Sequence, residues 1–402
     1  MQEHPQARFI VDTLRKEGFV AYYAGGWVRD FLLQRESDDI DIATNAPPEA
    51  IQSLFPHTVP IGLAFGIILV IVEGHQYEVA TFRQDFDYQD GRRPASIAFS
   101  TAEEDAKRRD FTINGMFYDP IEQKVLDFVG GQVDLQAKIL RAIGNPHERI
   151  KEDRLRMIRA ARLACRLHFT IDPATQEAIC AHAKELFPAV AVERIWQELS
   201  KGLLFDNLVP MLLMLHDFGL LETIFPSLQG VKKEEILKRL EPVKNFPKEA
   251  PLISHLLELF PKSSLEEALE LCQSLKLSRQ DMQFVGFLFH MKQSVNAPKE
   301  QVEPITWAYI YANPLHPICL QILAAHQKEK EAFLQLHAEQ KKSLEQATER
   351  IQKATPLVTS RDLMELGVEP GKKMGLLLKE AERLSINENI QNKEQILRRL
   401  QI

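Results

Sequence analysis

Two aspartates, Asp39 and Asp41, stand two positions apart in the segment DDIDI, residues 38–42. The apolar character of residues 40–43 predicts a strand, and alternation would then put both carboxylates on one strand face, about 6–7 Å apart along the backbone. Two such carboxylates can jointly bind a divalent cation, and Mg²⁺ usually takes one or two carboxylates together with substrate phosphates. A lone D-x-D is also common in capped turns. We expect Asp38, which alternates to the other face, to be a solvated turn residue.

A glycine pair precedes these aspartates, with twelve residues between the second glycine and Asp39. Gly25 and Gly26 stand where a strand is expected to end and a helix to begin. Glycines at such a junction let backbone N–H groups approach a phosphate, and the helix N-terminus favours negative charge. Arg29, one turn into the helix, can bind a triphosphate through charge-assisted hydrogen bonds. The alternative is a tight turn with a surface arginine. Combined with the acidic pair, the pattern predicts a magnesium-nucleotide site.

The Gly-Gly and Asp-x-Asp spacing resembles the nucleotidyltransferase superfamily that includes DNA polymerase β. The longer stretch GGWVRDFLLQRESDDIDIAT, residues 25–44, resembles the first motif of class II (bacterial-type) CCA-adding tRNA nucleotidyltransferases and their poly(A) polymerase relatives. It departs from the family at Gln34, where glycine is usual, and at Asp38, where a basic or polar residue is common. The resemblance implies that Glu78, in YEVATFR, is a further acidic residue of the site. The alternative for Glu78 is a solvent-facing position on a strand.

A second constellation is KRRDFTING, residues 107–115, which resembles the family motif RRDFTxNA. Arg109 can bind phosphate with both arms of its guanidinium. Asp110 offers an acceptor and Asn114 an amide, which together can read a ribose hydroxyl. Gly115 replaces the usual alanine. The alternative is the start of a helix with mixed charge.

A third constellation is EDRLR, residues 152–156. From residue types alone, Asp153 and Arg156 are three apart, share a helix face and form a solvated ion pair. The segment also resembles the family motif E-D-x-x-R, which implies that Asp153 and Arg156 form an amino-acid template for the Watson–Crick edge of the incoming base. A carboxylate accepts from an exocyclic amine and a guanidinium donates to ring acceptors. Guanine or uracil would leave buried groups unpaired and would be rejected.

Arg159 and Arg162 extend this segment as a basic stripe. Residues 141–170 contain eight Lys or Arg against three Asp or Glu, although the whole chain carries a formal charge of −7. A basic helix face indicates phosphate contact. We therefore expect Arg159 and Arg162 to flank the nucleotide.

Three further stretches resemble the same family. Residues 91–105 resemble its flexible loop, which the family associates with switching toward ATP, and residues 193–204, with Arg194 and Glu198, resemble a neck motif that supports the template helix. Residues 359–375 resemble the family tail, with its usual glycine replaced near Ser360. That tail would bind the tRNA elbow by shape and phosphate contacts.

The elements that must position these residues change character along the chain. The first part mixes helix and strand patterns, with helices expected at 3–17 and 27–33 and strands at 19–24, 40–43, 67–72, 76–82 and 125–129. Later residues are helical almost throughout, with helices expected at 150–167, 173–186, 192–204 and 209–218 and a long helical run at 319–353. The predicted fold is α+β: a small mixed α/β, polymerase β-like nucleotidyltransferase head (1–137) followed by an all-helical neck with the base template (138–205), a helical body (206–300) and a helical, tRNA-binding tail (301–402).

Composition sets broader limits. Hydrophobic residues make up 45% and charged residues 26% of 402 residues, which is ordinary for a globular protein. None of the four cysteines forms a C-x-x-C pair, so reduced thiols in a cytoplasmic protein are expected. The acid-bearing N-terminal segment does not resemble a signal peptide. No window approaches the roughly 18 apolar residues of a membrane span, so no membrane association is predicted.

These observations predict a template-independent RNA nucleotidyltransferase that completes or repairs the 3′ CCA end of tRNA from CTP and ATP. Asp39, Asp41 and Glu78 are its predicted catalytic acids, with two Mg²⁺ ions bound by Asp39 and Asp41. The predicted partners are the tRNA 3′ end and elbow, CTP and ATP, without a stable protein partner. The alternatives are a poly(A) polymerase, an enzyme adding only CC or only A, and a non-catalytic tRNA-binding protein.

Overall fold

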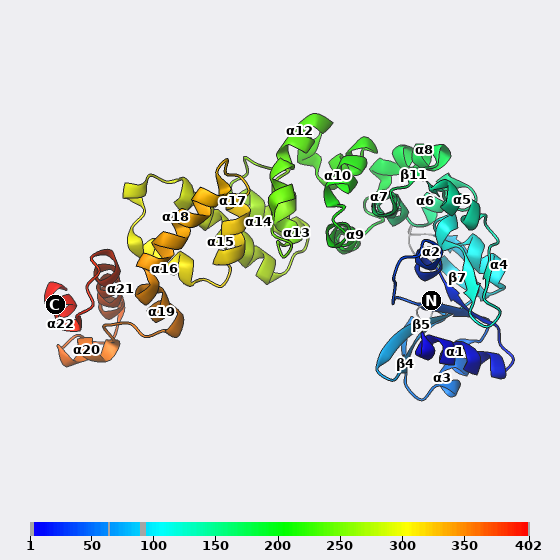
Figure 1. Ribbon diagram of the computed structural model, residues 1–402, viewed down its shortest axis with the longest axis horizontal. Helices are drawn as coiled ribbons and strands as arrows, with labels where there is room; N and C mark the ends of the chain where they lie inside the picture. The colour runs from blue at the N-terminus through cyan, green and yellow to red at the C-terminus, as the bar shows by residue number, and fades with distance from the viewer. Residues whose placement is uncertain (1–3, 63–64, 89–93, 401–402) are drawn as a thin grey trace. The chain divides into compact units, whose positions relative to one another are not determined.

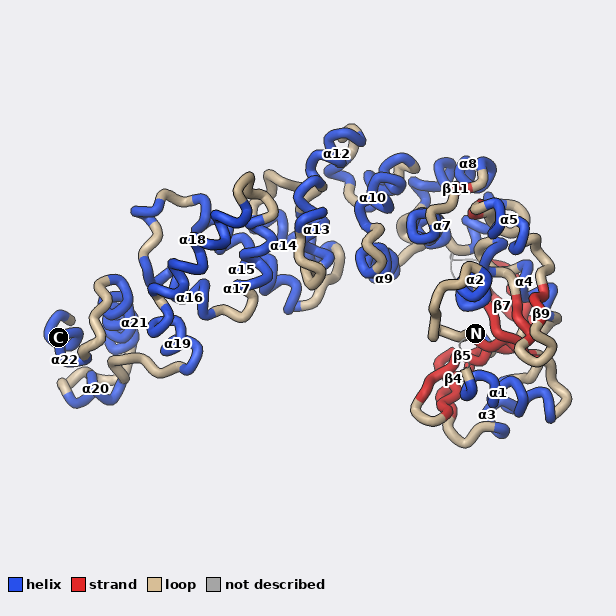
Figure 2. The backbone as a smooth tube through the Cα atoms, viewed as in Figure 1, coloured by secondary structure: helices blue, strands red, loops and turns tan. Residues whose placement is uncertain are grey.

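The computed structural model describes residues 4–62, 65–88 and 94–400 (Figure 1). The chain divides by its internal contacts into two compact units, Met1–Lys233 and Glu234–Ile402. The first unit contains a mixed sheet and helices, and the described residues of the second form helices and their connections (Figure 2). The predicted α+β class is therefore confirmed. In the described residues, no helix is both long enough and apolar enough to cross a membrane.

The sheet of the first unit has seven strands in the order β3-β4-β5-β2-β1-β8-β9. Its strands are β1 (Ala21–Ala24), β2 (Asp41–Thr44), β3 (Thr58–Gly62), β4 (Ile67–Val72), β5 (His75–Thr81), β8 (Phe117–Asp119) and β9 (Lys124–Leu126). β2 and β5 are parallel, with Ile42 opposite Val79, and the other pairs are antiparallel. The strand predicted at 67–72 is confirmed as β4 with the same bounds.

Helices cover this sheet because their apolar residues fall on one side. In α1 (Pro5–Lys16) the buried residues Ala7, Ile10, Val11 and Leu14 follow helical spacing, and α1 contacts β1, β2 and α3 (Pro48–Leu54). α2 (Gly26–Leu32) follows β1 directly. α4 (Ala102–Lys107), the 3₁₀ turn η2 (Thr112–Asn114) and α5 (Gly131–Ala137) complete the head.

A separate antiparallel ribbon leaves the sheet after β5. It consists of β6 (Arg83–Tyr88) and β7 (Pro94–Phe99), with Arg83 opposite Phe99 at its base. The segment 91–105 was predicted to be a flexible loop, which is wrong for the part that β7 and α4 occupy. Residues 91–93 lie outside the described residues. The ribbon escaped prediction because its pairing depends on a hairpin partner rather than on a local apolar pattern.

The helices after the head form the remainder of the first unit. They are α6 (Pro146–Glu152), α7 (Leu155–Leu167), α8 (Pro173–His182), α9 (Val192–Leu204), α10 (Leu208–Asp217) and α11 (Leu220–Ile224), with short strands β10 (Ile139–Leu140) and β11 (Thr170–Ile171). The single helix predicted at 150–167 is wrong, because the chain breaks at Asp153. Asp153 has an extended backbone (φ −145°, ψ 102°), and its carboxylate accepts the N–H of Leu155 at 3.1 Å. Such a local side-chain bond competes with the helical bond and separates the two helices.

The second unit contains α12 (Lys233–Arg239, starting at the division), α13 (Leu252–Leu257), α14 (Leu265–Ser274), α15 (Arg279–Asn296), α16 (Pro304–Ala312), α17 (His316–Ala324), α18 (Lys330–Ser343), α19 (Glu345–Lys353), α20 (Ser360–Glu365), α21 (Lys372–Asn387) and α22 (Lys393–Arg399). The long run predicted at 319–353 is wrong, since it is divided among α17, α18 and α19. A continuous helix of that length would extend about 50 Å. The breaks instead let α18 and α19 both contact α16.

The last three helices share a small core of their own. Its buried members come from α20, α21, α22 and the adjoining turns: Val358, Leu363, Val368, Met374, Ala381, Ile390, Ile396 and Leu400. Thr359 caps α20 by accepting the N–H of Asp362, whose carboxylate accepts the N–H of Thr359 in return. This arrangement fixes the start of the segment whose sequence resembles the family tail.

Candidate functional site

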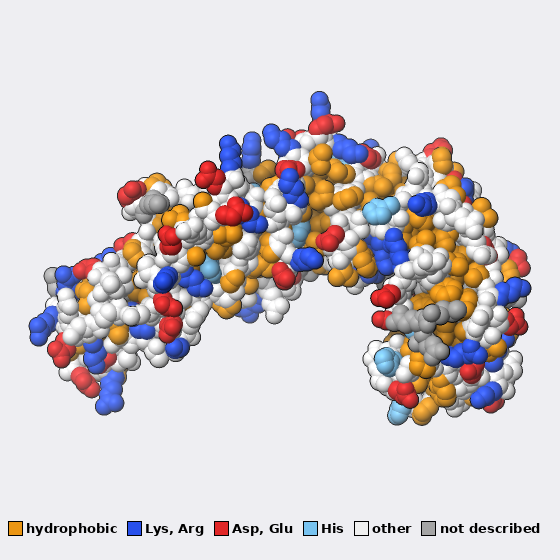
Figure 3. Space-filling view, viewed as in Figure 1, with side chains coloured by type: hydrophobic (Ala, Val, Ile, Leu, Met, Phe, Trp, Pro, Cys, Tyr) orange, Lys and Arg blue, Asp and Glu red, His pale blue; other side chains and the backbone are white. Residues whose placement is uncertain are grey.

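The residues singled out in the sequence converge on one cavity of about 650 Å³ in the first unit. All the predicted site residues except Glu78 line it: Gly25, Gly26, Arg29, Asp39, Asp41, Arg109, Asp110, Asn114, Asp153, Arg156, Arg159 and Arg162. They come from the turn after β1, from α2, from the start of β2 and the segment before it, from the segment after α4, and from α7 and the break that precedes it. In Figure 3, Lys and Arg side chains gather over the part of this unit where α7 and α9 lie.

The acidic side of the cavity is formed by Asp39 and Asp41. The prediction that both lie on one strand is wrong for Asp39, because β2 begins at Asp41 and Asp39 belongs to the preceding segment. Asp39 is exposed and Asp41 is partly buried, yet both line the cavity. Asp41 lies opposite Ala24, so the strand pairing brings it next to the glycine turn.

Like charges crowd around Asp41. Burial, together with the neighbouring carboxylates Asp39 and Glu78, raises the pKa of Asp41 to about 6, although Arg109 acts in the opposite direction. Glu78 is close because Val79 pairs with Ile42, which sets the preceding residues of the two parallel strands side by side. Glu78 is exposed, on the strand face opposite the buried Tyr77 and Val79. Glu78 therefore places a negative charge near Asp41 without lining the cavity.

The acidic residues do not form a closed metal cage. Within the described residues, no group of three or more His, Cys, Asp or Glu side chains is arranged to hold a metal ion. Asp39 and Asp41 supply carboxylate oxygens, the ligand type that Mg²⁺ prefers. A pair of carboxylates fits a metal whose other ligands come from a nucleotide and water.

The glycine turn brings backbone close to these acids. Gly25 has a positive φ of 68°, and a Cβ there would lie 3.2 Å from Nη1 of Arg109 and 3.6 Å from Oδ2 of Asp41. A side chain at this position would be strained and would crowd both groups. The residue type is thus required by the approach of the main chain to the charged lining.

Arg29 lies deeper than the sequence indicated. It is only 4% exposed, and it donates from Nη1 to Oδ1 of Asn114 at 2.7 Å and from Nε to Asp30 at 2.8 Å. Asn114 in turn donates to Asp110 at 3.1 Å. Arg29 is therefore held by protein groups at the cavity wall, and it orients Asn114.

Asp110 and Arg159 form a pair with two hydrogen bonds in the wall. Arg159 donates through Nε and Nη2 to Oδ2 of Asp110, at 2.9 and 2.6 Å. Burial opposes ionisation of Asp110, but the guanidinium of Arg159 and the amide of Asn114 outweigh it and hold the pKa of Asp110 well below its ordinary range. Arg162 pairs with Glu198 at 2.5 Å, both buried. The basic stripe thus meets protein carboxylates.

The two predicted template residues do not pair with each other. The carboxylate of Asp153 accepts hydrogen bonds from both Nη atoms of Arg194, at 3.1 and 2.8 Å. Arg156 donates to Glu152 at 2.7 Å and to the carbonyl oxygens of Arg149 and Arg108 at 2.7 and 3.1 Å. The prediction of an ion pair between Asp153 and Arg156 is wrong, because the helix break at Asp153 turns the side chain of Asp153 toward α9.

Sequence reasoning missed two groups of the site. One is Asp105, whose carboxylate binds both Arg108 and Arg109. Its signal was the spacing of three and four residues to two arginines at a helix end. The other is Arg166, which donates to Asp30 at 3.3 Å and stacks over Phe205 at 4.0 Å, linking α2 to α7 and the end of α9.

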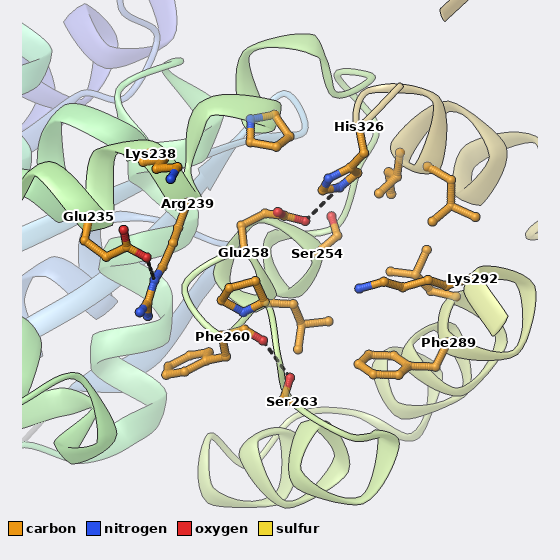
Figure 4. Close-up of a pocket in the computed structure, with 16 residues that line it drawn as sticks. Glu235, Lys238, Arg239, Ser254, Glu258, Phe260, Ser263, Phe289, Lys292 and His326 are labelled. Carbon is orange, nitrogen blue, oxygen red and sulfur yellow. Dashed lines mark hydrogen bonds and ion pairs between the residues drawn. The ribbon is translucent and has the colours of Figure 1, made fainter. Parts of the chain in front are cut away.

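A second cavity, of about 410 Å³, lies in the second unit (Figure 4). Its charged residues largely satisfy one another. Glu235 pairs with Arg239 at 3.0 Å, and Glu258 pairs with His326 at 3.2 Å. The first cavity differs because its acids Asp39 and Asp41 have no such partner among the described residues.

Family models match three successive parts of the chain. Residues 21–141 match the poly A polymerase head domain, residues 168–231 the RNA- and SrmB-binding site of polymerase A, and residues 246–400 the tRNA nucleotidyltransferase domain 2. The first match contains the acidic pair and the RRDFT segment. The fold and the site thus define a nucleotidyltransferase head with helical RNA-binding parts.

Relatives extend this likeness over the whole chain. The CCA-adding enzyme of Enterococcus faecalis is 34% identical over 98% of this chain and 95% of its own length. The CCA-adding enzyme of Anoxybacillus flavithermus is 40% identical over 59% of this chain, and that alignment spans 59% of the relative's length. A crystal structure of the Bacillus stearothermophilus CCA-adding enzyme in complex with CTP is similar with a TM-score of 0.80 and 27% identity, covering 99% of this chain and 98% of that one. The chain belongs to the family of class II CCA-adding enzymes.

Proposed function

We propose that this protein adds or repairs the 3′-terminal CCA of tRNA from CTP and ATP without a nucleic-acid template. The observation that carries the proposal is the single cavity that joins the acids Asp39 and Asp41 to the base-reading candidates Asp153 and Arg156. The near full-length relation to the Enterococcus faecalis enzyme supports it. The reaction is attack of the tRNA 3′-hydroxyl on the α-phosphate of the nucleotide, with pyrophosphate leaving.

Asp39 and Asp41 are the proposed ligands of two Mg²⁺ ions, with Glu78 adding negative charge beside them. Bound there, the metals would lower the pKa of the attacking hydroxyl and stabilise the leaving pyrophosphate. The crowding that raises the pKa of Asp41 supports a cation at this place, because a cation would offset the repulsion from Asp39 and Glu78. The two carboxylates supply oxygen donors at the start of β2 and in the segment just before it.

The nucleotide is proposed to lie between the glycine turn and the neck helices. Gly25 and Gly26 let the main chain approach the phosphates, and Arg109 presents its guanidinium beside them. Asp110 and Asn114 are the proposed ribose contacts. Arg29, Arg159 and Arg162 are proposed to act on the nucleotide indirectly. Their hydrogen bonds to Asn114, Asp110 and Glu198 hold the polar groups of the cavity wall in place.

Asp153 and Arg156 are the proposed readers of the base. A carboxylate has about four lone-pair positions, so Asp153 can accept an exocyclic amine N–H while it holds Arg194. Arg156 can donate from the same guanidinium whose Nη atoms are fixed by Glu152 and Arg108. Cytosine and adenine both present an amine donor and a ring-nitrogen acceptor, whereas uracil and guanine present a carbonyl acceptor and a ring N–H donor at these places, which leaves the protein groups unpaired.

Each of the four successive segments of the chain has a proposed role. We propose that residues 1–137 act as the catalytic head, 138–205 as the neck, 206–300 as the body and 301–402 as the tail that binds the tRNA elbow. The capped turn and small core of the last three helices support a rigid element there. The four free cysteines support a cytoplasmic location.

The test offers radiolabelled CTP and ATP, singly and together, to tRNAs that end before CCA, after C and after CC. The proposal expects two C additions with CTP alone, and completion to CCA when ATP is added. Extension only of the tRNA ending in CC, or only of the shorter tRNAs, would indicate an A-adding or CC-adding enzyme. Extension of an unrelated oligonucleotide by many A residues would indicate a poly(A) polymerase. No extension of any tRNA would contradict the proposal.

A matched pair of variants tests the metal ligands in the same assay. Asp39→Ala combined with Asp41→Ala is expected to abolish incorporation and to leave tRNA binding within about twofold, because the RNA contacts lie elsewhere. Asp38→Asn is the control, since Asp38 is exposed and does not line the cavity. Incorporation that persists in the double variant would overturn the assignment.

A further inference from the structure

Asp105 is a buried carboxylate at the base of the site that the sequence did not single out. It lies in α4 and is only 1% exposed. Oδ1 accepts from Nε and Nη2 of Arg108, at 2.9 and 2.6 Å, and Oδ2 accepts from Nε and Nη2 of Arg109, at 3.1 and 3.0 Å. One negative charge therefore orients two guanidiniums.

The bond to Asp105 determines which edge of Arg109 meets the cavity. The Nε and Nη2 edge is bound to Asp105, and the guanidinium carbon lies 4.9 Å from the ring centre of Phe117. The remaining nitrogen, Nη1, lies against the glycine turn, 3.2 Å from where a Cβ of Gly25 would be. A guanidinium held along one edge and stacked on a ring has lost most of its freedom before any anion binds. Its free edge is ready to donate to phosphate.

The bond to Arg108 extends the effect of Asp105 to the base-reading side. The carbonyl oxygen of Arg108 accepts from Nη2 of Arg156 at 3.1 Å. Nε of Arg108 also donates to the carbonyl oxygen of Arg83 at 3.1 Å, and Oδ1 of Asp105 accepts the N–H of Arg83 at 3.3 Å. Arg83 begins β6, so the same carboxylate also holds the base of the β6–β7 ribbon.

We propose that Asp105 is a positioning residue for nucleotide binding, which fixes Arg109 for the triphosphate and, through Arg108, fixes Arg156 for the base. The inference rests on the proposed function for the identity of the nucleotide. It goes beyond that function by naming one carboxylate that couples the phosphate side of the cavity to the base side. A carboxylate is required at this position, because an amide of the same shape offers one neutral acceptor oxygen and turns an N–H donor toward one of the two guanidiniums.

The test compares Asp105→Asn with Glu103→Gln in the full-length protein. Both changes turn a carboxylate into an amide on α4, but Glu103 is exposed and pairs only with Lys107 at the surface. Inorganic tripolyphosphate probes the phosphate side alone, and misincorporation of UTP and GTP probes the base side. D105N is expected to weaken tripolyphosphate binding about tenfold and to raise misincorporation about fivefold, in line with loss of a charge-assisted contact. E103Q is expected to match the wild type in both.

A double-mutant cycle separates positioning from general loss of structure. If Asp105 acts through Arg109, then Arg109→Gln and the combination of D105N with R109Q bind tripolyphosphate equally weakly. Additive losses, or a D105N protein that binds tripolyphosphate and selects bases as E103Q does, would overturn the inference. Should D105N not fold, as judged by its thermal unfolding, Asp105→Glu takes its place in the same cycle. Glutamate keeps the charge but is longer and displaces both guanidiniums, so D105E is expected to bind tripolyphosphate more weakly than wild type, and its combination with R109Q as weakly as R109Q alone. Wild-type binding by D105E, or additive losses, would overturn the inference.

The tripolyphosphate measurement also separates this inference from the proposed function. Binding of tripolyphosphate needs no tRNA and no reaction. A wild-type protein that fails to extend tRNA would count against the proposed function, while the D105N comparison would still decide the role of Asp105 at the phosphate side.

Discussion

The carboxylates at the acidic side of the cavity and those of its arginine-lined wall have opposite environments. Asp41, beside Asp39 and Glu78, has a raised pKa of about 6, because burial and like charges disfavour its ionised form. Asp110 is more deeply buried, yet its pKa lies below the ordinary range, because Arg159 holds it in two hydrogen bonds. Burial alone therefore does not decide the state of a carboxylate; the partner does.

This difference separates two uses of charge in one cavity. Asp153, Glu198 and Asp105 resemble Asp110, since each is bonded to at least one arginine. Paired charges build a rigid wall, whereas the crowded acids Asp39 and Asp41 have no arginine bonded to them among the described residues. Native proteins commonly lose stability where a functional group is kept uncompensated. The following predictions test the two uses separately.

The largest effect is expected for Asp41→Asn. Nucleotide incorporation should fall by about 1,000-fold or more, since one of the two proposed metal-binding carboxylates is removed. Stability at pH 7 in the absence of metal should not fall, and a gain of up to about 2 kcal/mol is expected, because a carboxyl with a raised folded-state pKa is unfavourable when ionised. Activity assays and thermal unfolding measure the two effects. Loss of stability in D41N would show that Asp41 is paired after all.

Asp110→Asn should have the opposite signature. Removing the partner of Arg159 is expected to lower the free energy of unfolding by about 2 kcal/mol, measured by urea denaturation at pH 7. Because the folded-state pKa of Asp110 is lowered, its ionised form contributes full stability above about pH 4, the ordinary value, and loses it as the pH falls further. The gap between wild type and D110N should therefore narrow below about pH 4. A gap that stays constant down to acid unfolding would contradict the ionic account.

Arg194→Lys tests whether the two hydrogen bonds from Arg194 are needed to orient the carboxylate of Asp153. Lysine keeps the charge but replaces two directed N–H donors by a point charge. Discrimination of CTP against UTP is expected to weaken about tenfold, which corresponds to about 1.4 kcal/mol, with single-nucleotide incorporation of CTP itself changed much less. Primer extension with each nucleotide alone measures this. Unchanged discrimination would mean that Arg194 supports the fold and not the reading of the base.

The smallest effect is expected for Phe205→Ala. It removes the ring under Arg166, and a partly exposed cation–π contact is worth about 1 kcal/mol. A fall of that size in unfolding free energy, with nucleotide affinity within about twofold of wild type, would place the contact in the wall and outside the reaction. A large loss of nucleotide affinity would show that Arg166 acts on the nucleotide.

Local sequence patterns predicted many of the helices and strands of this molecule. They did not predict which side chains pair with one another. The strand at 67–72 and the helix at 192–204 have the expected bounds, because the strand is an uninterrupted apolar run and the helix has one apolar face. The break at Asp153 was missed, because it depends on a side chain bonding to nearby main chain instead of the helix continuing. The partner of Asp153 is Arg194, which is brought to it only by the packing of α7 against α9.

The role of Arg29 shows the same limit. Its position after two glycines predicted an arginine aimed at phosphate, but the folded chain also offers it Asn114, 85 residues away in sequence. Asp105 could have been noticed from its spacing to Arg108 and Arg109, although spacing alone does not distinguish a surface pair from a buried one. Residue types identified the chemistry; tertiary contacts determined which charges are compensated.

The central claim, that Asp41 is kept uncompensated for a metal ion, is tested most directly by a Mg²⁺ titration of the thermal unfolding midpoint. The measurement uses wild type, Asp41→Asn and the neighbouring Asp38→Asn, each with CTP at a fixed saturating concentration. A ligand that binds only the folded state at ten times its dissociation constant stabilises by about 1.4 kcal/mol. The account predicts a rise of that order for wild type and D38N and no specific rise for D41N. An equal response of all three proteins would contradict it.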